Sequence, residues 1–197
     1  KKSLLLVAVT ILIMVVYNYP KLNILAGYSA KNTASSVFLG KRTLQFTDST
    51  DNNFSPVDLA SDEVDTLEQQ ASATVFGLLT RKALFREGLG AVLTLTSENE
   101  KEPFLKPKRA NPDYITPYPF GNAPQKDTVF SNIAYNRLNT TINSIFGKRK
   151  TRAVVVIYKD QIIAEKYAPG FHKDSRILGW SMTKSILSTV FGVMQHQ

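Results

Sequence analysis

The longest apolar run of the chain lies at its N-terminus and has no polar face. Residues 3–17 read SLLLVAVTILIMVVY and follow two lysines. About fifteen apolar residues suit a signal-peptide core, and extension through Tyr17–Pro20 adds an aromatic flank typical of a membrane interface. No small-residue cleavage site follows closely, which favours an uncleaved anchor through residues 4–19. The alternatives are a cleaved signal peptide and a buried helix of a soluble domain. The two lysines predict that the rest of the chain is exported.

The pattern after this run changes to short segments separated by turn-forming residues. Ser61–Gln70 begins with a capping serine and an acidic first turn, which predicts a short helix. Three apolar segments then predict a strand meander over residues 73–80, 82–86 and 90–95. Prolines recur throughout residues 103–124, so an extended loop or linker is expected there.

The C-terminal part predicts a helix, a hairpin and a second helix. Apolar residues at helical spacing predict a helix over residues 130–146, with Gly147 as its cap and Lys148–Lys150 complementing its end. Two β-branched runs, residues 152–159 and 162–167, predict a hairpin that turns at Asp160–Gln161.

The second helix follows a loop over Phe171–Trp180 and begins near Ser181. Apolar residues cover most of its circumference, which is typical of a core helix. Its narrow polar stripe consists of small residues and one lysine. The expected architecture is therefore an α+β fold, an antiparallel sheet with helices behind a hydrophobic N-terminal helix. Four segments are expected: the anchor or signal peptide (1–20), the meander region (21–102), the proline-rich linker (103–127) and a C-terminal domain (128–197).

The polar stripe contains a candidate nucleophile and its base. Ser181 and Lys184 are three residues apart, so both side chains lie on one face of the helix. At the first turn of the helix, unpaired N–H groups and the positive end of the dipole favour a developing oxyanion. If the helix is buried, desolvation lowers the pKa of the Lys184 amine, and the neutral amine can accept the serine proton.

A structural interpretation of the same residues is also possible. Ser181 can cap the helix, and Lys184 can extend its ammonium group to solvent from an ordinary packed helix. A chain with this many serines and lysines contains the spacing about once by chance, so the order of the surrounding elements carries the functional interpretation.

That order resembles a known family. The region from Val154 to Met194, and above all the segment LGWSMTKS at 178–185, resembles the nucleophile region of the β-lactamase-related serine hydrolases. The family includes class C β-lactamases, D-alanyl-D-alanine carboxypeptidases, esterases and 6-aminohexanoate-dimer hydrolases. Residues 27–31 (GYSAK) and 36–39 (SVFL) are similar to the N-terminal part of membrane-anchored members of the last type.

The resemblance implies a β-lactamase/transpeptidase-like fold, with Ser181 as acyl-accepting nucleophile and Lys184 as the group that activates it. It also implies a Tyr-x-Asn or Tyr-x-Ser loop and a Lys/His-Thr/Ser-Gly strand, and neither motif follows Ser181. The domain over residues 128–197 is therefore interpreted as incomplete. This chain alone is expected to be inactive, because Met182, Ile186 and Phe191 would lack part of their packing.

Composition excludes some functions and leaves others open. Without cysteine there is no disulfide or thiolate metal site, and His172 and His196 cannot form a histidine-rich metal cluster. The sequence does not exclude a Ser-His-Asp triad, but His172 lies in the loop before the helix and His196 at its end, so both are expected to be surface histidines. We therefore predict no metal and no cofactor. The net charge of +8 is spread along the chain without a nucleic-acid motif, so no nucleic-acid partner is expected. Attraction to an anionic membrane surface or cell-wall polymer explains the excess positive charge as well as nucleic-acid binding would, and plain solvated surface charge is favoured over both.

These observations together predict a serine hydrolase that acts by covalent acyl transfer on a small-molecule amide or ester. Its expected location is the bacterial cell envelope, anchored in the inner membrane with the domain in the periplasm or outside, or secreted if the leader is cleaved. The alternative is a non-catalytic anchored binding or scaffold protein with a degenerate hydrolase fold. A basic nucleic-acid binder is a third possibility, and it would leave the N-terminal apolar run without a role. The sequence specifies neither the substrate nor the oligomeric state.

Overall fold

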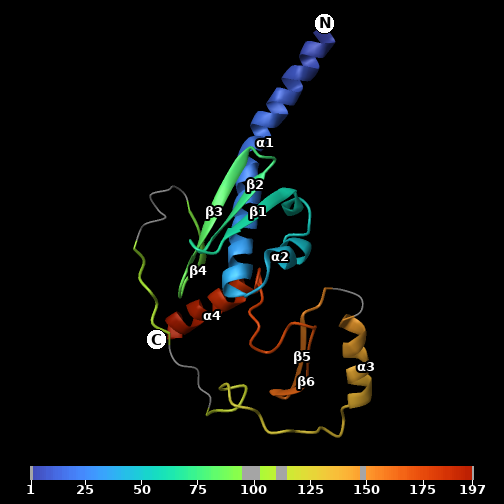
Figure 1. Ribbon diagram of the computed structural model, residues 1–197. Coiled ribbons are helices and arrows are strands. Elements are labelled where there is room, and N and C mark those ends of the chain that lie inside the picture. The colour runs from blue at the N-terminus through green and yellow to red at the C-terminus, as the bar shows by residue number, and fades with distance from the viewer. Residues whose placement is uncertain (1, 95–102, 110–114, 147–149, 197) are drawn as a thin grey trace.

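One long helix, α1 (Lys2–Ala34), links the apolar N-terminus to the folded body of the protein. The computed structural model describes residues 2–94, 103–109, 115–146 and 150–196 (Figure 1). The apolar half of α1 projects away from the body, and its large side chains are exposed, from Leu5 at 67% to Val16 at 64%. The helix continues through Pro20, and its second half packs on a sheet. Long enough and apolar enough to cross a membrane, α1 is compatible with an anchor or a signal sequence.

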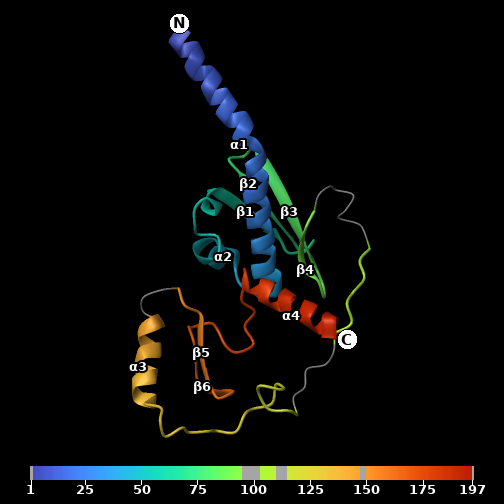
Figure 2. The same ribbon diagram turned by 180° about the vertical axis from the view of Figure 1, so that it is seen from behind.

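The sheet behind α1 is a four-stranded antiparallel meander in sequence order. Its strands are β1 (Ala60–Asp65), β2 (Gln70–Val75), β3 (Leu79–Arg86) and β4 (Gly90–Leu93). The register pairs Ala60 with Val75 and Val75 with Leu79. Alanines at both surfaces of the helix–sheet interface are fully buried, and these are Ala26, Ala30 and Ala34 on α1 and Ala71, Ala73 and Ala83 on the strands. Their small side chains allow the helix to lie close against the sheet (Figure 2).

The structure confirms the meander and corrects its boundaries. The short helix predicted over residues 61–70 is wrong, because β1 occupies its first half, a turn follows, and β2 begins at Gln70. The residues of β1 alternate between partly buried and exposed positions, with Val64 partly buried against the core, and this twofold period is that of a strand. The strand predicted over residues 73–80 contains a turn at Phe76–Leu78, so Thr80 belongs to β3.

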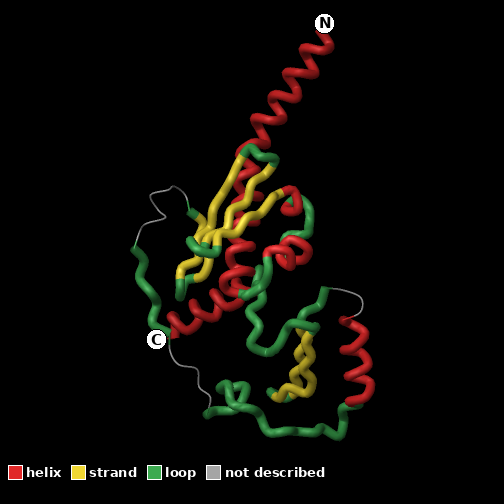
Figure 3. The backbone as a smooth tube through the Cα atoms, in the orientation of Figure 1, coloured by secondary structure: helices red, strands yellow, loops and turns green. Residues whose placement is uncertain are grey.

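A hairpin and a helix form a second group of elements. The hairpin consists of β5 (Ala153–Tyr158) and β6 (Gln161–Tyr167), and α3 (Tyr135–Phe146) lies beside it (Figure 3). The hairpin turns at Lys159–Asp160, where φ is 48° and 58°, and not at the predicted Asp160–Gln161. A two-residue turn in which both residues have a left-handed backbone matches the twist of the two strands. Lys159 and Asp160 have this backbone, so the turn lies one residue earlier than predicted.

Helix α3 begins later than predicted because the segment before it makes other contacts. The Phe130 ring packs edge-on against Tyr158 at 5.0 Å, and the Phe130 amide donates to the Tyr135 hydroxyl at 3.1 Å. The predicted cap at Gly147 lies outside the described residues. Residues 103–109 are without regular structure, as the prolines predicted, and 115–124 contain only an isolated bridge between Pro117 and Ala123.

A network of polar side chains joins α1, the segment that follows α2 (Leu44–Thr50), and β1. Asn52 is only 3% exposed, and its amide nitrogen lies 3.1 Å from Ser29 Oγ, 3.0 Å from Thr33 Oγ1 and 2.9 Å from Asp62 Oδ2. Ser29 Oγ also donates to Asp62 Oδ2 at 2.7 Å. Buried polar groups are stable only when they are paired in this way, so the network fixes how α1 sits against the end of α2 and the first strand.

Candidate active site

The predicted nucleophile and base lie within hydrogen-bond distance of each other. Ser181 immediately precedes α4 (Met182–His196), and Lys184 Nζ donates to Ser181 Oγ at 2.8 Å. Backbone amides of the first turn donate back to the carbonyls of residues 179–181. The serine oxygen thus lies at the N-terminal end of α4, where the helix dipole is positive, with the Lys184 amine beside it.

Trp180 holds Ser181 against the N-terminal body. Its φ of +46° is a left-handed conformation that is unfavourable for a bulky residue. Its ring packs on Tyr28 of α1 at 5.6 Å and on Phe54 at 5.8 Å, and those two rings meet edge-on at 5.8 Å. Three aromatic side chains from distant parts of the sequence thus fix the backbone immediately before the nucleophile.

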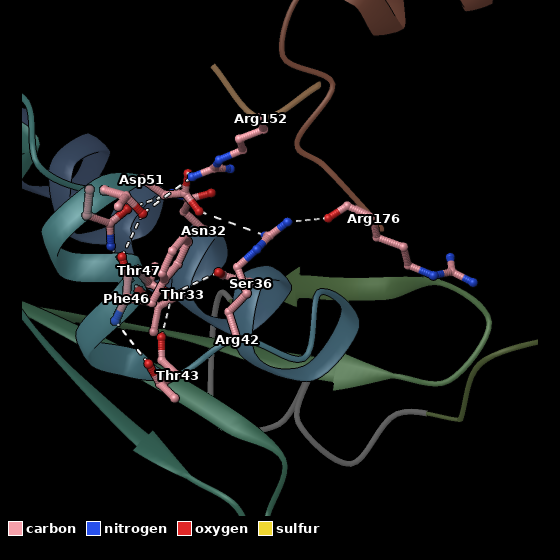
Figure 4. Close-up of polar contacts among 12 residues, drawn as sticks. Asn32, Thr33, Ser36, Arg42, Thr43, Phe46, Thr47, Asp51, Arg152 and Arg176 are labelled. Atoms are coloured by element: carbon pink, nitrogen blue, oxygen red, sulfur yellow. Dashed lines mark hydrogen bonds and ion pairs between the residues drawn. The ribbon is translucent and has the colours of Figure 1, made fainter. Parts of the chain in front are cut away.

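A second contact fixes the loop that leads to Trp180. Arg42 donates to the carbonyl oxygen of Arg176, five residues before Ser181 (Figure 4). The same Arg42 guanidinium lies over the Phe171 ring at 5.5 Å. A cavity of about 280 Å³ lies between the loop and the body and is lined by Arg42, Phe46, Phe171 and Ser175, among others.

Asp51 holds the two arginines that join the body to the hairpin. Its side chain is 7% exposed, and it pairs with Arg152, which precedes β5, and at 3.9 Å with Arg42. Both guanidinium groups stack on the Phe46 and Phe171 rings at 5.3–6.0 Å. Burial and the neighbouring Arg152 lower the pKa of Arg42, while Asp51 raises it. One carboxylate thus compensates two partly buried cations (Figure 4).

The prediction that α4 is a buried core helix is wrong for the described chain. None of its residues is buried, and Met182, Ile186 and Phe191 are 66%, 65% and 62% exposed. The expectation that these three residues lack packing is confirmed. Lys184 is exposed as well, so the buried position expected for its amine is not found among the described residues.

Sequence reasoning found the serine–lysine pair and missed the residues that position it. Arg42, Asp51 and Phe54 belong to no motif, and Tyr28 lies in the 27–31 segment, for which the sequence implied no role. All four approach residues 171–181 only after the chain has folded. The one local feature of the sequence that could have indicated these contacts is Trp180, because a large aromatic residue between Gly179 and Ser181 indicates a loop that packs against other residues. His172 and His196 are both exposed. Within the described residues, no group of three histidine or acidic side chains could hold a metal ion.

A pair of carboxylates lies apart from this site, between α2 and β1. Asp48 and Asp62 line a cavity of about 910 Å³. Burial raises the pKa of Asp48 to about 6, and the charge of Asp62 and a hydrogen bond with it contribute. Asp62 Oδ1 is buried without a donor among the described residues, and a protonated Asp48 can supply one.

We expect the Asp48–Asp62 pair to lower the free energy of unfolding as the pH rises. The pKa of Asp48 is near 4 in the unfolded chain and about 6 in the folded one. Between these values the folded state binds more protons, so its stability decreases with increasing pH until Asp48 is fully ionised. An Asp48→Asn variant should therefore gain stability relative to the wild type between pH 4 and pH 7. Denaturant unfolding in detergent at several pH values measures this, and a difference that is constant with pH would contradict the coupling.

Comparisons with known proteins identify no relative of the chain. No protein-family model matches it, and no curated protein or solved structure does so either.

Proposed function

We propose that this chain forms the nucleophile-bearing part of a membrane-anchored serine hydrolase of the β-lactamase-related type. The observation that carries the proposal is the 2.8 Å contact between Lys184 Nζ and Ser181 Oγ at the N-terminus of α4. The hairpin β5–β6, the loop and the helix follow one another in the order expected of that family. Helix α1 is the proposed anchor, with the body in the periplasm or outside the cell.

The proposed reaction is covalent acyl transfer to Ser181. Neutral Lys184 accepts the hydroxyl proton as Ser181 Oγ forms a bond to the carbonyl carbon of an amide or ester. The Ser181 backbone N–H provides half of the oxyanion hole. The tetrahedral intermediate collapses by breaking the bond to the amine or alcohol, which leaves with the proton from Lys184. Water then attacks the acyl carbon and gives up a proton to Lys184. The bond between Ser181 Oγ and the acyl group breaks, the carboxylic acid leaves, and Lys184 returns the proton to Ser181.

The exposure of α4 sets a requirement on this mechanism. An ammonium group in water keeps its proton at neutral pH, so Lys184 can act as a base only after desolvation. Substrate, or further protein that covers α4, must supply this. The proposed β-lactamase-like fold would place such protein over the exposed apolar residues of the helix.

The same exposure favours one other candidate function. A degenerate hydrolase fold that serves as an anchored binding or scaffold protein needs no desolvated lysine, and it would use the apolar face of α4 for contact. In that case Ser181 is an unreactive residue at the start of a helix.

Covalent labelling separates the two functions. The natural protein, isolated with every segment that accompanies this chain in the cell, is treated with a fluorophosphonate probe and digested with trypsin. We expect one adduct on the peptide Ile177–Lys184, at Ser181 and not at Thr183. An unlabelled peptide, with the protein folded and the probe active on a control hydrolase, would favour the scaffold function.

A further inference from the structure

The turn between β2 and β3 carries an exposed apolar surface beside α1. Phe76 is 63% exposed and Leu78 is 60% exposed, with Gly77 between them. The turn lies at the end of the sheet where α1 leaves the body, in both views of the chain (Figures 1 and 2). Tyr19 of α1 donates to the Leu78 carbonyl oxygen at 3.5 Å, so the turn is level with Tyr19 along the helix.

The length of the apolar part of α1 places this level at a membrane surface. Residues 5–19 span roughly 22 Å at 1.5 Å per residue, which is less than the about 30 Å of a bilayer hydrocarbon core. If α1 spans a bilayer, Tyr19 therefore lies at the edge of the hydrocarbon or slightly within it. Tyr17 and Tyr19 are exposed aromatics of the kind that occupy such interfaces.

Charged groups mark the next level along α1. Lys21 Nζ lies 4.1 Å from the centre of the Tyr17 ring, and Arg81 of β3 donates to Asn23 Oδ1 at 3.0 Å. Asn23 is one helical turn beyond Tyr19, about 6 Å further from the hydrocarbon. Along α1, the apolar turn and Tyr19 come first, and Lys21 and Arg81 follow. Polarity increases in the same order from the acyl chains of a membrane to its lipid phosphates.

The backbone of the turn is a second observation. Phe76 has φ of +53°, a conformation that costs a bulky residue about 1 kcal/mol or more and that asparagine or glycine adopts readily. Nothing lies within 4 Å of a Cβ added at Gly77, so the turn has open space around it. A phenylalanine in this conformation, with most of its surface exposed, lies largely outside the packing of the described body.

We propose that Phe76 and Leu78 insert into the interface of the membrane that α1 crosses, with Lys21 and Arg81 at the level of its anionic headgroups. The body is then held to the bilayer at two points, which limits rotation about the anchor and fixes the height of the sheet and of Ser181. The inference rests on the anchoring role of α1 proposed above and not on acyl transfer.

Nitroxide labelling of two matched leucines tests this contact. The chain contains no cysteine, so Leu78→Cys and Leu67→Cys each introduce a single labelling site. Leu67 is 92% exposed in the β1–β2 turn, at the opposite end of the sheet. Both proteins are placed in phosphatidylcholine vesicles containing phosphatidylglycerol, and collision with oxygen and with a soluble nickel chelate is measured. We expect several-fold less nickel collision and more oxygen collision at position 78 than at position 67.

A polar substitution provides the matched variant. Phe76→Asn fits the left-handed backbone and removes the apolar ring, so in the Leu78→Cys protein it should restore nickel access without unfolding the sheet. Equal nickel access at positions 78 and 67, in protein that floats with the vesicles, would overturn the two-point contact and leave the anchor intact. Protein that does not float would overturn the anchor and the contact together. Neither result depends on the reactivity of Ser181.

Discussion

We expect Ser181→Ala to abolish labelling of the natural protein by the fluorophosphonate probe. The probe reacts with an activated hydroxyl, and Ser181 Oγ is the hydroxyl in contact with Lys184. Alanine removes that oxygen from an exposed position at the start of α4, so stability should change by no more than about 0.5 kcal/mol. In-gel fluorescence measures the labelling, and circular dichroism reports the fold.

Two variants on the same helix complete the design. Ser185→Ala removes an exposed hydroxyl near the same face and should label at the wild-type rate. Lys184→Gln retains the nucleophile without the base, and we expect the rate to fall by about 10²- to 10⁴-fold. Wild-type labelling of Ser181→Ala would place the reactive serine elsewhere. Equal loss in Ser181→Ala and Ser185→Ala would indicate damage to α4 instead of loss of a nucleophile.

The second large effect is expected at Asp51. Replacing it with asparagine leaves Arg42 and Arg152 close together without their carboxylate, and both are mostly buried, at 10% and 18% exposure. Removing one partner of a buried ion pair typically costs about 3–5 kcal/mol, and the residual exposure of Arg152 places this site near the lower value. Denaturant unfolding in detergent measures the loss.

The control for this variant is an exposed aspartate on the same side of the body. Asp58→Asn makes the same chemical change at an exposed side chain of the 3₁₀ turn Val57–Leu59 and should alter stability by less than about 0.5 kcal/mol. Because Arg152 precedes β5, Asp51→Asn should also accelerate amide exchange in the β5–β6 hairpin relative to β2 and β3. Equal effects of the two substitutions would show that Asp51 does not hold the hairpin to the body.

The position of Asp51 suggests how the body supports the proposed site. Arg42 contacts both Asp51 and the Arg176 carbonyl, while Trp180 packs on Tyr28 and Phe54. The loop before Ser181 is therefore fixed at Arg176, in its middle, and at Trp180, its last residue, by side chains of the N-terminal body. A reactive serine gains from such support, because small displacements of a nucleophile greatly reduce its rate.

The sequence by itself determined the features that depend on neighbouring residues. Uniform apolarity predicted the exposed first half of α1, β-branched runs predicted the hairpin, and helical spacing placed Lys184 on the face of Ser181. Each of these features depends on residues that are close together in the chain, so it can be read without knowledge of the fold. The short helix expected over residues 61–70 was wrong because its acidic first turn was given more weight than the alternation that forms β1.

Only the tertiary structure decided which distant residues meet. Arg42 and Arg176 are 134 positions apart, and Asp51 and Arg152 are 101 apart, so no local pattern relates them. The structure also decided that α1 continues through Pro20 to become the core helix of the sheet, and that α4 is exposed. Apolar periodicity shows that a helix has a face to bury, but burial itself depends on which other segments reach that face.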